Sequence, residues 1–202
     1  MLYQVHQLKD SGRPGSARLI QLINGELEKT LSVEGSSLYG IFVPLFGLAS
    51  NEIYLVSYAQ KPTTLDLPPE IQELSCRDLI PTVRPTEDEP RSRPGIYVFR
   101  WFSVAADSVD EIIRLSSEAW PTFEASFETE VQGLFVDQGD SPGGMLLITW
   151  YKDLSVWEES RQPPEKARDN FLRRHQLTLS ALPIATMLAG EASGTSRLIS
   201  HS

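Results

Sequence analysis

The chain has 202 residues, of which 41% are hydrophobic and 22% charged, proportions typical of a globular protein that can bury a core. Its formal net charge of −9 disfavours nucleic acids and anionic membranes as main partners, because both are bound through clustered Lys and Arg. Cys76 is the only cysteine, which excludes an internal disulfide. The first residues, Met1–His6, lack the basic start and apolar run of a secretory signal, and no apolar stretch approaches the roughly 20 residues of a membrane span. These features predict a cytoplasmic protein.

The first part of the chain predicts the order β-α-β-β-α-β, from runs of β-branched and aromatic residues that alternate with helix-forming segments. The expected elements are a strand at Leu2–Leu8, a helix at Ser16–Leu31, strands at Leu38–Phe46 and Glu52–Gln60, a helix at Glu70–Leu79 and a strand at Ile80–Val83.

A proline-rich segment follows, and its three prolines and alternating charges cannot pair as a central strand. The sequence therefore predicts a first unit at 1–84, a linker at 85–95, a second unit at 96–189 and a flexible tail at 190–202.

The second unit predicts the same order of elements. The expected strands are Ile96–Phe102, Val131–Asp137, Met145–Tyr151 and Leu182–Leu188, with a hairpin turn at 140–144 and a second helical region whose main part is Glu165–Thr178. Two capping boxes, Ser108–Glu111 and Ser155–Glu158, are expected to begin helices, since the Ser hydroxyl and Glu carboxylate can satisfy free amides of the first turn.

The two halves resemble each other at a constant spacing. Gly40–Val43 aligns with Gly133–Val136 and Ile53–Tyr58 aligns with Leu146–Tyr151, both at an offset of 93 residues (133 − 40 and 146 − 53). The matches predict a tandem repeat of one ferredoxin-like α+β unit.

The strand Ile96–Phe102 carries apolar residues on both faces, so its sheet needs a second cover besides its helices. The sister unit is the obvious candidate. We therefore expect the two units to pack sheet to sheet as an intramolecular pseudo-dimer.

Three segments resemble the NIPSNAP branch of the dimeric α/β-barrel superfamily. They are Tyr97–Phe102, Ile148–Asp153 and, more weakly, Tyr3–Leu8, and Arg161 falls near the helix arginine of that family. The resemblance implies an α+β fold in which two ferredoxin-like units form an intrachain dimeric α/β barrel. The superfamily includes cofactor-free monooxygenases, haem-degrading enzymes and haem peroxidases, so the resemblance implies a pocket but no particular reaction. Val98 and Gln4 replace the usual Glu, so any role of that carboxylate is absent here.

Arg100 and His6 occupy corresponding positions of the two units (100 − 6 = 94). If their strand faces meet, a cation and an imidazole point into an apolar cavity, the usual form of a small-ligand site. The arginine could hold a carboxylate or a phenolate oxygen through two donors. Tyr58, Trp150 and Tyr151 are candidates for the cavity wall. The alternatives are that Arg100 pairs with a core carboxylate, that His6 is a satisfied or edge residue, and that the aromatic side chains only fill the core.

Haem is a further alternative, because haem-degrading relatives use a helix histidine, for which His175 is the candidate, with Trp157 nearby. Those relatives also use an asparagine on the first strand, where this chain has Phe99, Arg100 and Trp101. The sequence thus predicts no cofactor, and no metal site either, since its histidines belong to no spaced ligand motif.

Three hypotheses for function follow. The first is a small-molecule-binding protein, in its enzymatic form a cofactor-independent monooxygenase acting on an aromatic or polyketide-like substrate. The second is a non-catalytic interaction or scaffold protein with a filled inter-sheet core, and the third is a haem-binding protein. The expected partner is a small apolar or aromatic ligand, and association into a homodimer stays open.

Overall fold

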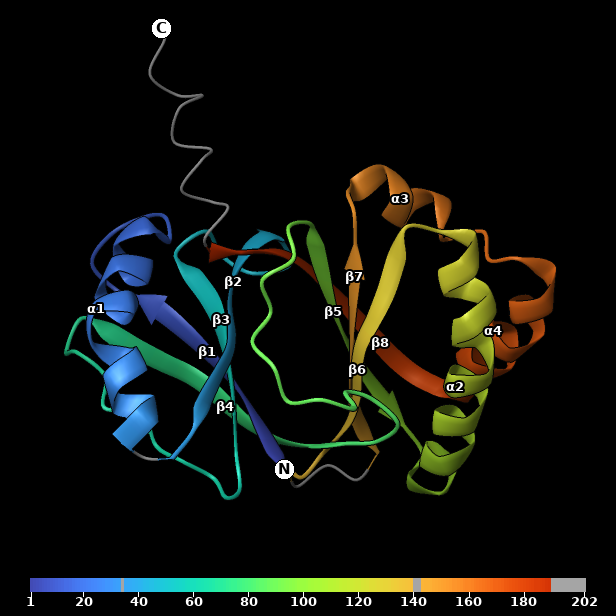
Figure 1. The fold of residues 1–202 in the computed structure, drawn as a ribbon, viewed down its shortest axis with the longest axis horizontal. Helices are drawn as coiled ribbons and strands as arrows, with labels where there is room; N and C mark the ends of the chain where they lie inside the picture. Colours follow the sequence, from blue (N-terminus) through green and yellow to red (C-terminus); the bar gives the residue numbers. More distant parts are fainter. Residues whose placement is uncertain (34, 140–142, 190–202) are drawn as a thin grey trace, which may run out of the picture. The chain divides into compact units, whose positions relative to one another are not determined.

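The computed structural model describes residues 1–33, 35–139 and 143–189, which contain eight β-strands and four α-helices (Figure 1). The predicted tail at 190–202 and part of the predicted turn at 140–144 lie outside the described residues. No helix among the described residues is both long and apolar enough to cross a membrane. The elements are β1 (Leu2–Asp10), α1 (Ala17–Val33), β2 (Ser37–Phe46), β3 (Glu52–Ala59), β4 (Ile71–Pro81), β5 (Ile96–Val104), the 3-10 helix η1 (Ala106–Ser108), α2 (Val109–Ser126), β6 (Thr129–Asp137), β7 (Gly144–Tyr151), α3 (Leu154–Glu159), α4 (Glu165–Leu177) and β8 (Thr178–Leu188).

The chain divides into two compact units that exchange short segments. Among the described residues, unit 1 consists of Met1–Asp78, Asp88–Pro94 and 184–189, and unit 2 consists of Leu79–Glu87 and Gly95–Pro183. Strands β4 and β8 therefore each begin in one unit and end in the other.

Unit 1 is an antiparallel sheet with one long helix. Strand β3 pairs with β1 from Glu52 to Ala59 and with β2 on its other side, and the end of β8 adds to β2 through pairs such as Val43 with Met187. Alternate strand residues pack with α1 into an apolar core. That core contains Leu8, Leu19, Ile23, Leu31, Ile41, Val43, Ile53, Leu55, Ile71 and Ala189.

In unit 2, strand β7 lies between β5 and β6 in the sheet. It pairs with β5 from Ile96↔Tyr151 to Ser103↔Gly144 and with β6 on its other edge, while the end of β4 pairs with β6 at Leu79–Pro81. Helices α2 and α4 contact each other (Figure 1). Apolar side chains of the sheet and α2 form the core, which contains Phe102, Val104, Ile112, Trp120, Val131, Leu134, Met145 and Leu147.

The predicted helix at Glu70–Leu79 is wrong, because this segment forms strand β4. Its end is strand as predicted, but it stops at Pro81 rather than Val83. The segment has helix-forming residues, yet only two of its apolar residues, Ile71 and Leu79, are buried, too few to define the apolar stripe of a helix. Side chains of β1 contact this strand: Gln4 donates a hydrogen bond to Asp78, and His6 lies against Glu73. These tertiary contacts override the weak local preference of the segment for helix.

Neither predicted capping box forms. Ser108 is the N-cap of α2 but has helical backbone angles and makes no capping bond, and its hydroxyl bonds to Asp107 instead. At α3 the cap is Asp153, whose extended backbone lets its carboxylate accept from the Val156 amide at 3.0 Å. Ser155 lies inside that helix. An extended residue before the first turn, rather than the serine motif, therefore sets where α3 begins.

Candidate functional site

Unit 2 contains a cavity of about 440 Å³ between its sheet and its helices, a volume that suits a small ligand. Strands β5 and β7 provide one wall and the helical segments the other. Aromatic rings dominate the apolar part of the lining, and they are Phe102, Trp120, Phe123, Trp157 and Phe171.

Strand alternation explains which side chains reach the cavity. Arg100 and Phe102 share one face of β5, and Leu147, Thr149 and Tyr151 share the matching face of β7. On α4, Phe171 and Arg174 are three residues apart and so lie on one helix face. The cavity thus combines polar groups from two strands and a helix.

Three arginines line this cavity, Arg100, Arg161 and Arg174, and of these Arg161 is exposed. Arg100 and Arg174 are half-buried, and within the described part of the chain neither forms a salt bridge. The Arg174 guanidinium lies 4.7 Å from the ring centroid of Phe171 and donates to the Ser116 hydroxyl at 3.2 Å. Burial, together with the positive charge of Arg100, lowers the pKa of Arg174 to about 10. An anion between the two guanidinium groups would relieve this repulsion.

Tyr151 places a phenol beside the arginines. Burial raises the pKa of its hydroxyl, against the opposing effects of Arg100, Arg174 and hydrogen bonds with Ser160 and Thr149. The phenol is therefore neutral near pH 7 and can donate a hydrogen bond to a ligand oxygen.

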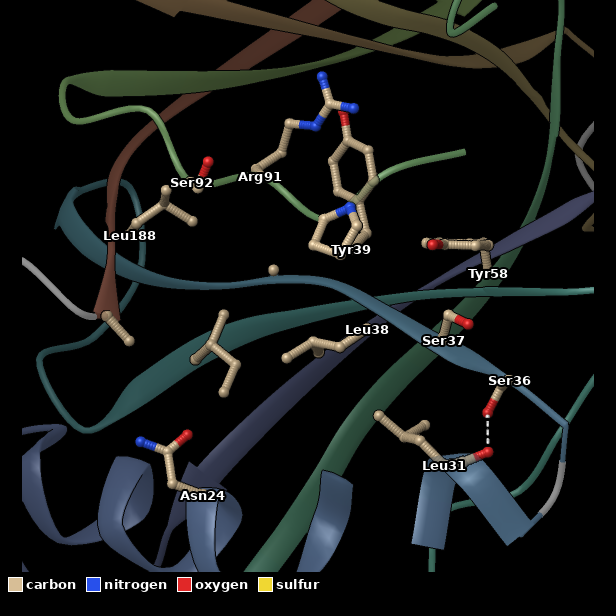
Figure 2. A pocket seen from close by; sticks show the side chains of 14 residues that line it. Asn24, Leu31, Ser36, Ser37, Leu38, Tyr39, Tyr58, Arg91, Ser92 and Leu188 are labelled. Carbon is tan, nitrogen blue, oxygen red and sulfur yellow. Dashed lines mark hydrogen bonds between the residues drawn. The ribbon is translucent and has the colours of Figure 1, made fainter. Parts of the chain in front are cut away.

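Unit 1 contains a separate cavity of about 650 Å³. Figure 2 shows Tyr39, Tyr58 and Arg91 on one side of it and the apolar side chains of Leu31 and Leu38 elsewhere in the lining. The Arg91 guanidinium lies 4.8 Å from the centroid of the Tyr39 ring, and the Arg91 amide donates to the Tyr39 carbonyl at 2.7 Å. This lining offers fewer groups that would select an anion than the cavity of unit 2.

The structure distributes the five ligand-binding candidates over several places. Arg100 and Tyr151 line the unit 2 cavity, and Tyr58 lines the unit 1 cavity. His6 is buried on β1, where its Nδ1 lies 2.6 Å from Glu73 Oε1. Trp150 is buried but does not line either cavity, because it lies on the opposite face of β7 from Tyr151.

The inter-sheet site depended on the Arg100 face of its strand meeting the other sheet. Arg100 instead lines a cavity between the sheet and the helices of its own unit. Both faces of β5 are apolar, and apolar patterning alone cannot tell which one the helices cover.

The sequence argument missed Arg174 and Ser160, both of which line the same cavity. Arg174 stands in the polar run Arg173–Gln176, a composition typical of a solvated helix face. Its neighbours are exposed, and Arg173 pairs with Glu111. The spacing of Phe171 and Arg174 is the signal that could have placed Arg174 on the inner face. His175, the haem candidate, also lines the cavity, but its side chain is exposed.

No family model matches this sequence, and no curated protein is similar to it in sequence. Solved structures nevertheless share its fold. An inferred monooxygenase from Lactobacillus acidophilus is 10% identical, with 93% of each chain covered and a TM-score of 0.59. An anthrone oxidase-like protein is 12% identical, with 93% of this chain and 91% of the other covered and a TM-score of 0.58.

A chlorite dismutase variant from Candidatus Nitrospira defluvii is 7% identical, with 93% of this chain and 91% of the other covered and a TM-score of 0.61. At such low identity these likenesses show the fold alone. This chain shares with them a mixed α+β fold.

Proposed function

We propose that the cavity of unit 2 binds a small aromatic or polyketide-like molecule that carries a carboxylate or phenolate oxygen. The observation that carries this proposal is the pair of arginines, Arg100 and Arg174, that face an aromatic-lined cavity without a carboxylate partner among the described residues. Guanidinium groups hold such oxygens through two donors. Tyr151 would add a third donor, and Trp120 and Phe171 would pack against the ring system of the ligand.

The reaction that this site suits best is a cofactor-independent monooxygenation. Two guanidinium groups would favour the enolate form of an anthrone-like substrate, because they stabilise the negative oxygen. That electron-rich carbanion could then react with O2, giving a quinone and water: one oxygen atom enters the substrate and the other leaves as water. The names of two structural neighbours, one an inferred monooxygenase and one an anthrone oxidase-like protein, support this choice of substrate class.

Two broader inferences accompany this proposal. The repeated strand and hairpin motifs support an origin of the two units by duplication, with a NIPSNAP-like second unit. The single cysteine and the acidic composition support a cytoplasmic location.

Haem does not fit this cavity well. A metal-binding histidine usually donates its other ring nitrogen to a carboxylate or carbonyl, which fixes the ring. Among the described residues, the exposed His175 side chain forms no such hydrogen bond. We therefore do not propose a haem-dependent function.

The scaffold hypothesis expected a filled interior near Arg100, and the open cavity of about 440 Å³ favours ligand binding instead. A binding experiment with a defined probe separates the two. Anthraquinone-2-carboxylate combines a planar ring system with a carboxylate, and its binding can be followed through quenching of tryptophan fluorescence, since Trp120 and Trp157 line the cavity.

We expect Arg100→Gln to weaken binding of this probe by about 10- to 150-fold, because a hydrogen bond to a charged group contributes about 1.5–3 kcal/mol. Arg114→Gln is the matched control, since Arg114 is 58% exposed and pairs with Glu118 away from the cavity lining. Equal affinities of the two variants would refute the assigned site.

Turnover is tested separately with anthrone as the substrate and an oxygen electrode. We expect one O2 consumed for each anthraquinone formed, at a rate that falls in Arg100→Gln. Binding of the carboxylate probe without any turnover above buffer would leave the binding function standing and refute the monooxygenase.

A further inference from the structure

Unit 1 gathers three side chains of metal-ligating type at one place. His6 on β1 and Glu73 and Cys76 on β4 each offer a ligand atom, and these atoms all lie within 4.8 Å of one another. In a tetrahedral zinc site the ligand atoms are about 3.3–3.8 Å apart, as follows from metal–ligand bonds of about 2.0–2.3 Å. His6 Nδ1 and Glu73 Oε1 are 2.6 Å apart, so binding would move this pair slightly apart. The exposed side chains of Glu73 and Cys76 can make these adjustments by small rotations, while the buried His6 stays fixed.

The local course of β4 brings these ligands together. Glu73 and Cys76 are three residues apart, and on a regular strand they would point to opposite faces. Both nevertheless place a ligand atom within 4.8 Å of that of His6.

His6 has bonding capacity that the protein does not use. Its side chain is only 1% exposed, its Nδ1 lies 2.6 Å from Glu73 Oε1, and its Nε2 is buried without a hydrogen-bond partner among the described residues. A buried polar atom that lacks a partner is destabilising. Glu73 contacts only one of the two ring nitrogens, so the imidazole keeps a nitrogen that can bind a metal ion.

The surroundings of the cluster favour a cation. Within the described residues neither Glu73 nor the adjacent Asp78 forms an ion pair with Lys or Arg. Gln4 donates to Asp78 at 3.0 Å and to Cys76 Sγ at 3.7 Å, and its oxygen accepts from the Thr63 amide and hydroxyl, each at 2.9 Å. Both the nitrogen and the oxygen of the Gln4 side-chain amide are therefore hydrogen-bonded. Gln4 in this way fixes the positions of Cys76 and Asp78 beside His6.

We propose that His6, Glu73 and Cys76 bind a zinc ion, with water in the fourth position. One imidazole, one thiolate and one carboxylate are ligands that Zn²⁺ accepts, and three protein ligands with one open position are typical of a zinc site that is accessible to a small molecule. The exposure of Glu73 and Cys76 leaves that position open to solvent. This site lies in unit 1 and is independent of the function proposed for the cavity of unit 2.

The test uses the full chain, kept reduced with a phosphine and freed of metal. Zn²⁺ is titrated by calorimetry, and Co²⁺ is titrated as a spectroscopic probe, because a thiolate bound to Co²⁺ gives an intense near-ultraviolet band. We expect one ion per chain and this band in the unaltered protein. Cys76→Ser should abolish the band, and Glu73→Gln should weaken Zn²⁺ binding by about 10-fold or more.

Asp66→Asn is the matched control, because Asp66 is an exposed carboxylate of the same unit outside the cluster. It should bind Zn²⁺ with unchanged affinity. The proposal is overturned if Cys76→Ser and Glu73→Gln bind as tightly as the control, or if the unaltered protein gives only the weak spectrum of octahedral Co²⁺. Near-ultraviolet circular dichroism of each variant separates loss of a ligand from loss of the fold, and Glu73→Gln changes an exposed side chain that the core does not need.

Discussion

Replacing Glu124 by alanine should destabilise unit 2 by about 2–3 kcal/mol. Glu124 projects from α2 and joins three parts of the unit. Its Oε2 accepts from Arg84 Nη2 at 3.1 Å and its Oε1 from Arg84 Nη1, while Oε1 also accepts from the Val131 amide at 2.7 Å. Arg84 in turn lies 5.1 Å from the centroid of the Trp120 ring. The carboxylate therefore connects α2, β6 and the segment that follows β4.

The magnitude follows from these bonds. Alanine removes a bidentate charged pair, whose hydrogen bonds contribute about 1.5–3 kcal/mol, and leaves a backbone amide without its acceptor, at a cost of about 1–3 kcal/mol. Arg84 and Glu124 are 31% and 20% exposed, so water replaces part of what is lost. The net expectation is below the sum of the two contributions.

Urea unfolding followed by tryptophan fluorescence measures this change selectively. All four tryptophans, Trp101, Trp120, Trp150 and Trp157, lie in unit 2. Glu118→Ala is the matched control on the same helix, because the Arg114–Glu118 pair is 58% and 48% exposed and should contribute no more than about 0.5 kcal/mol. If the two variants unfold at the same urea concentration, the Arg84–Glu124–Val131 connection does not stabilise unit 2 as argued.

Three further predictions concern single positions. Gly95→Ala should destabilise unit 2 by about 1–3 kcal/mol or more, again measured in urea, because Gly95 has a φ of +138° and an added Cβ would lie 2.5 Å from the Tyr151 carbonyl oxygen; an unchanged midpoint would contradict this. Partial desolvation of the thiol, together with the charges of Glu73 and Asp78, raises the pKa of Cys76 to about 12, so alkylation by iodoacetamide should be slow at neutral pH. Its rate should rise about tenfold per pH unit into the alkaline range, whereas a pH-independent rate would argue against a protonated thiol. Arg100→Gln should leave the free energy of unfolding of the ligand-free protein unchanged or raise it by about 0.5–1 kcal/mol, because the substitution removes repulsion with Arg174. A clear loss of stability would show that Arg100 has a structural partner.

The elements that sequence patterns predicted best are the strands of unit 2. Their β-branched and aromatic runs are long and bounded by turn residues, and the observed β5 and β7 extend the predictions by only a few residues. The failure at β4 has a different cause. Its only buried apolar residues are Ile71 and Leu79, and its partner β1 is distant in the sequence, so no local pattern could indicate the pairing.

Sequence patterns identified residues of the candidate site only on the strands, where alternation along the strand indicates which side chains share a face. Arg100 and Tyr151 were identified from their strands, and the structure places both in one cavity. Arg174 approaches the same cavity from a helix that lies far along the chain, and the side of the sheet that this helix covers depends on packing. His6 was singled out as the counterpart of Arg100, but its contact with Glu73 depends on the strand conformation of β4, which the sequence pattern did not predict.

The passage of β8 from unit 2 into unit 1 has a consequence for synthesis on the ribosome. Domains usually fold in the order in which they emerge. Here β2 can pair with Ala185–Leu188 only after every strand of unit 2 has been translated, so unit 2 has all its strands before unit 1 does. Until then the nascent chain carries an unpaired β2 edge, and such edges recruit other strands. A growing chain would therefore gain most from a chaperone that covers β2 during the interval in which unit 2 is being made.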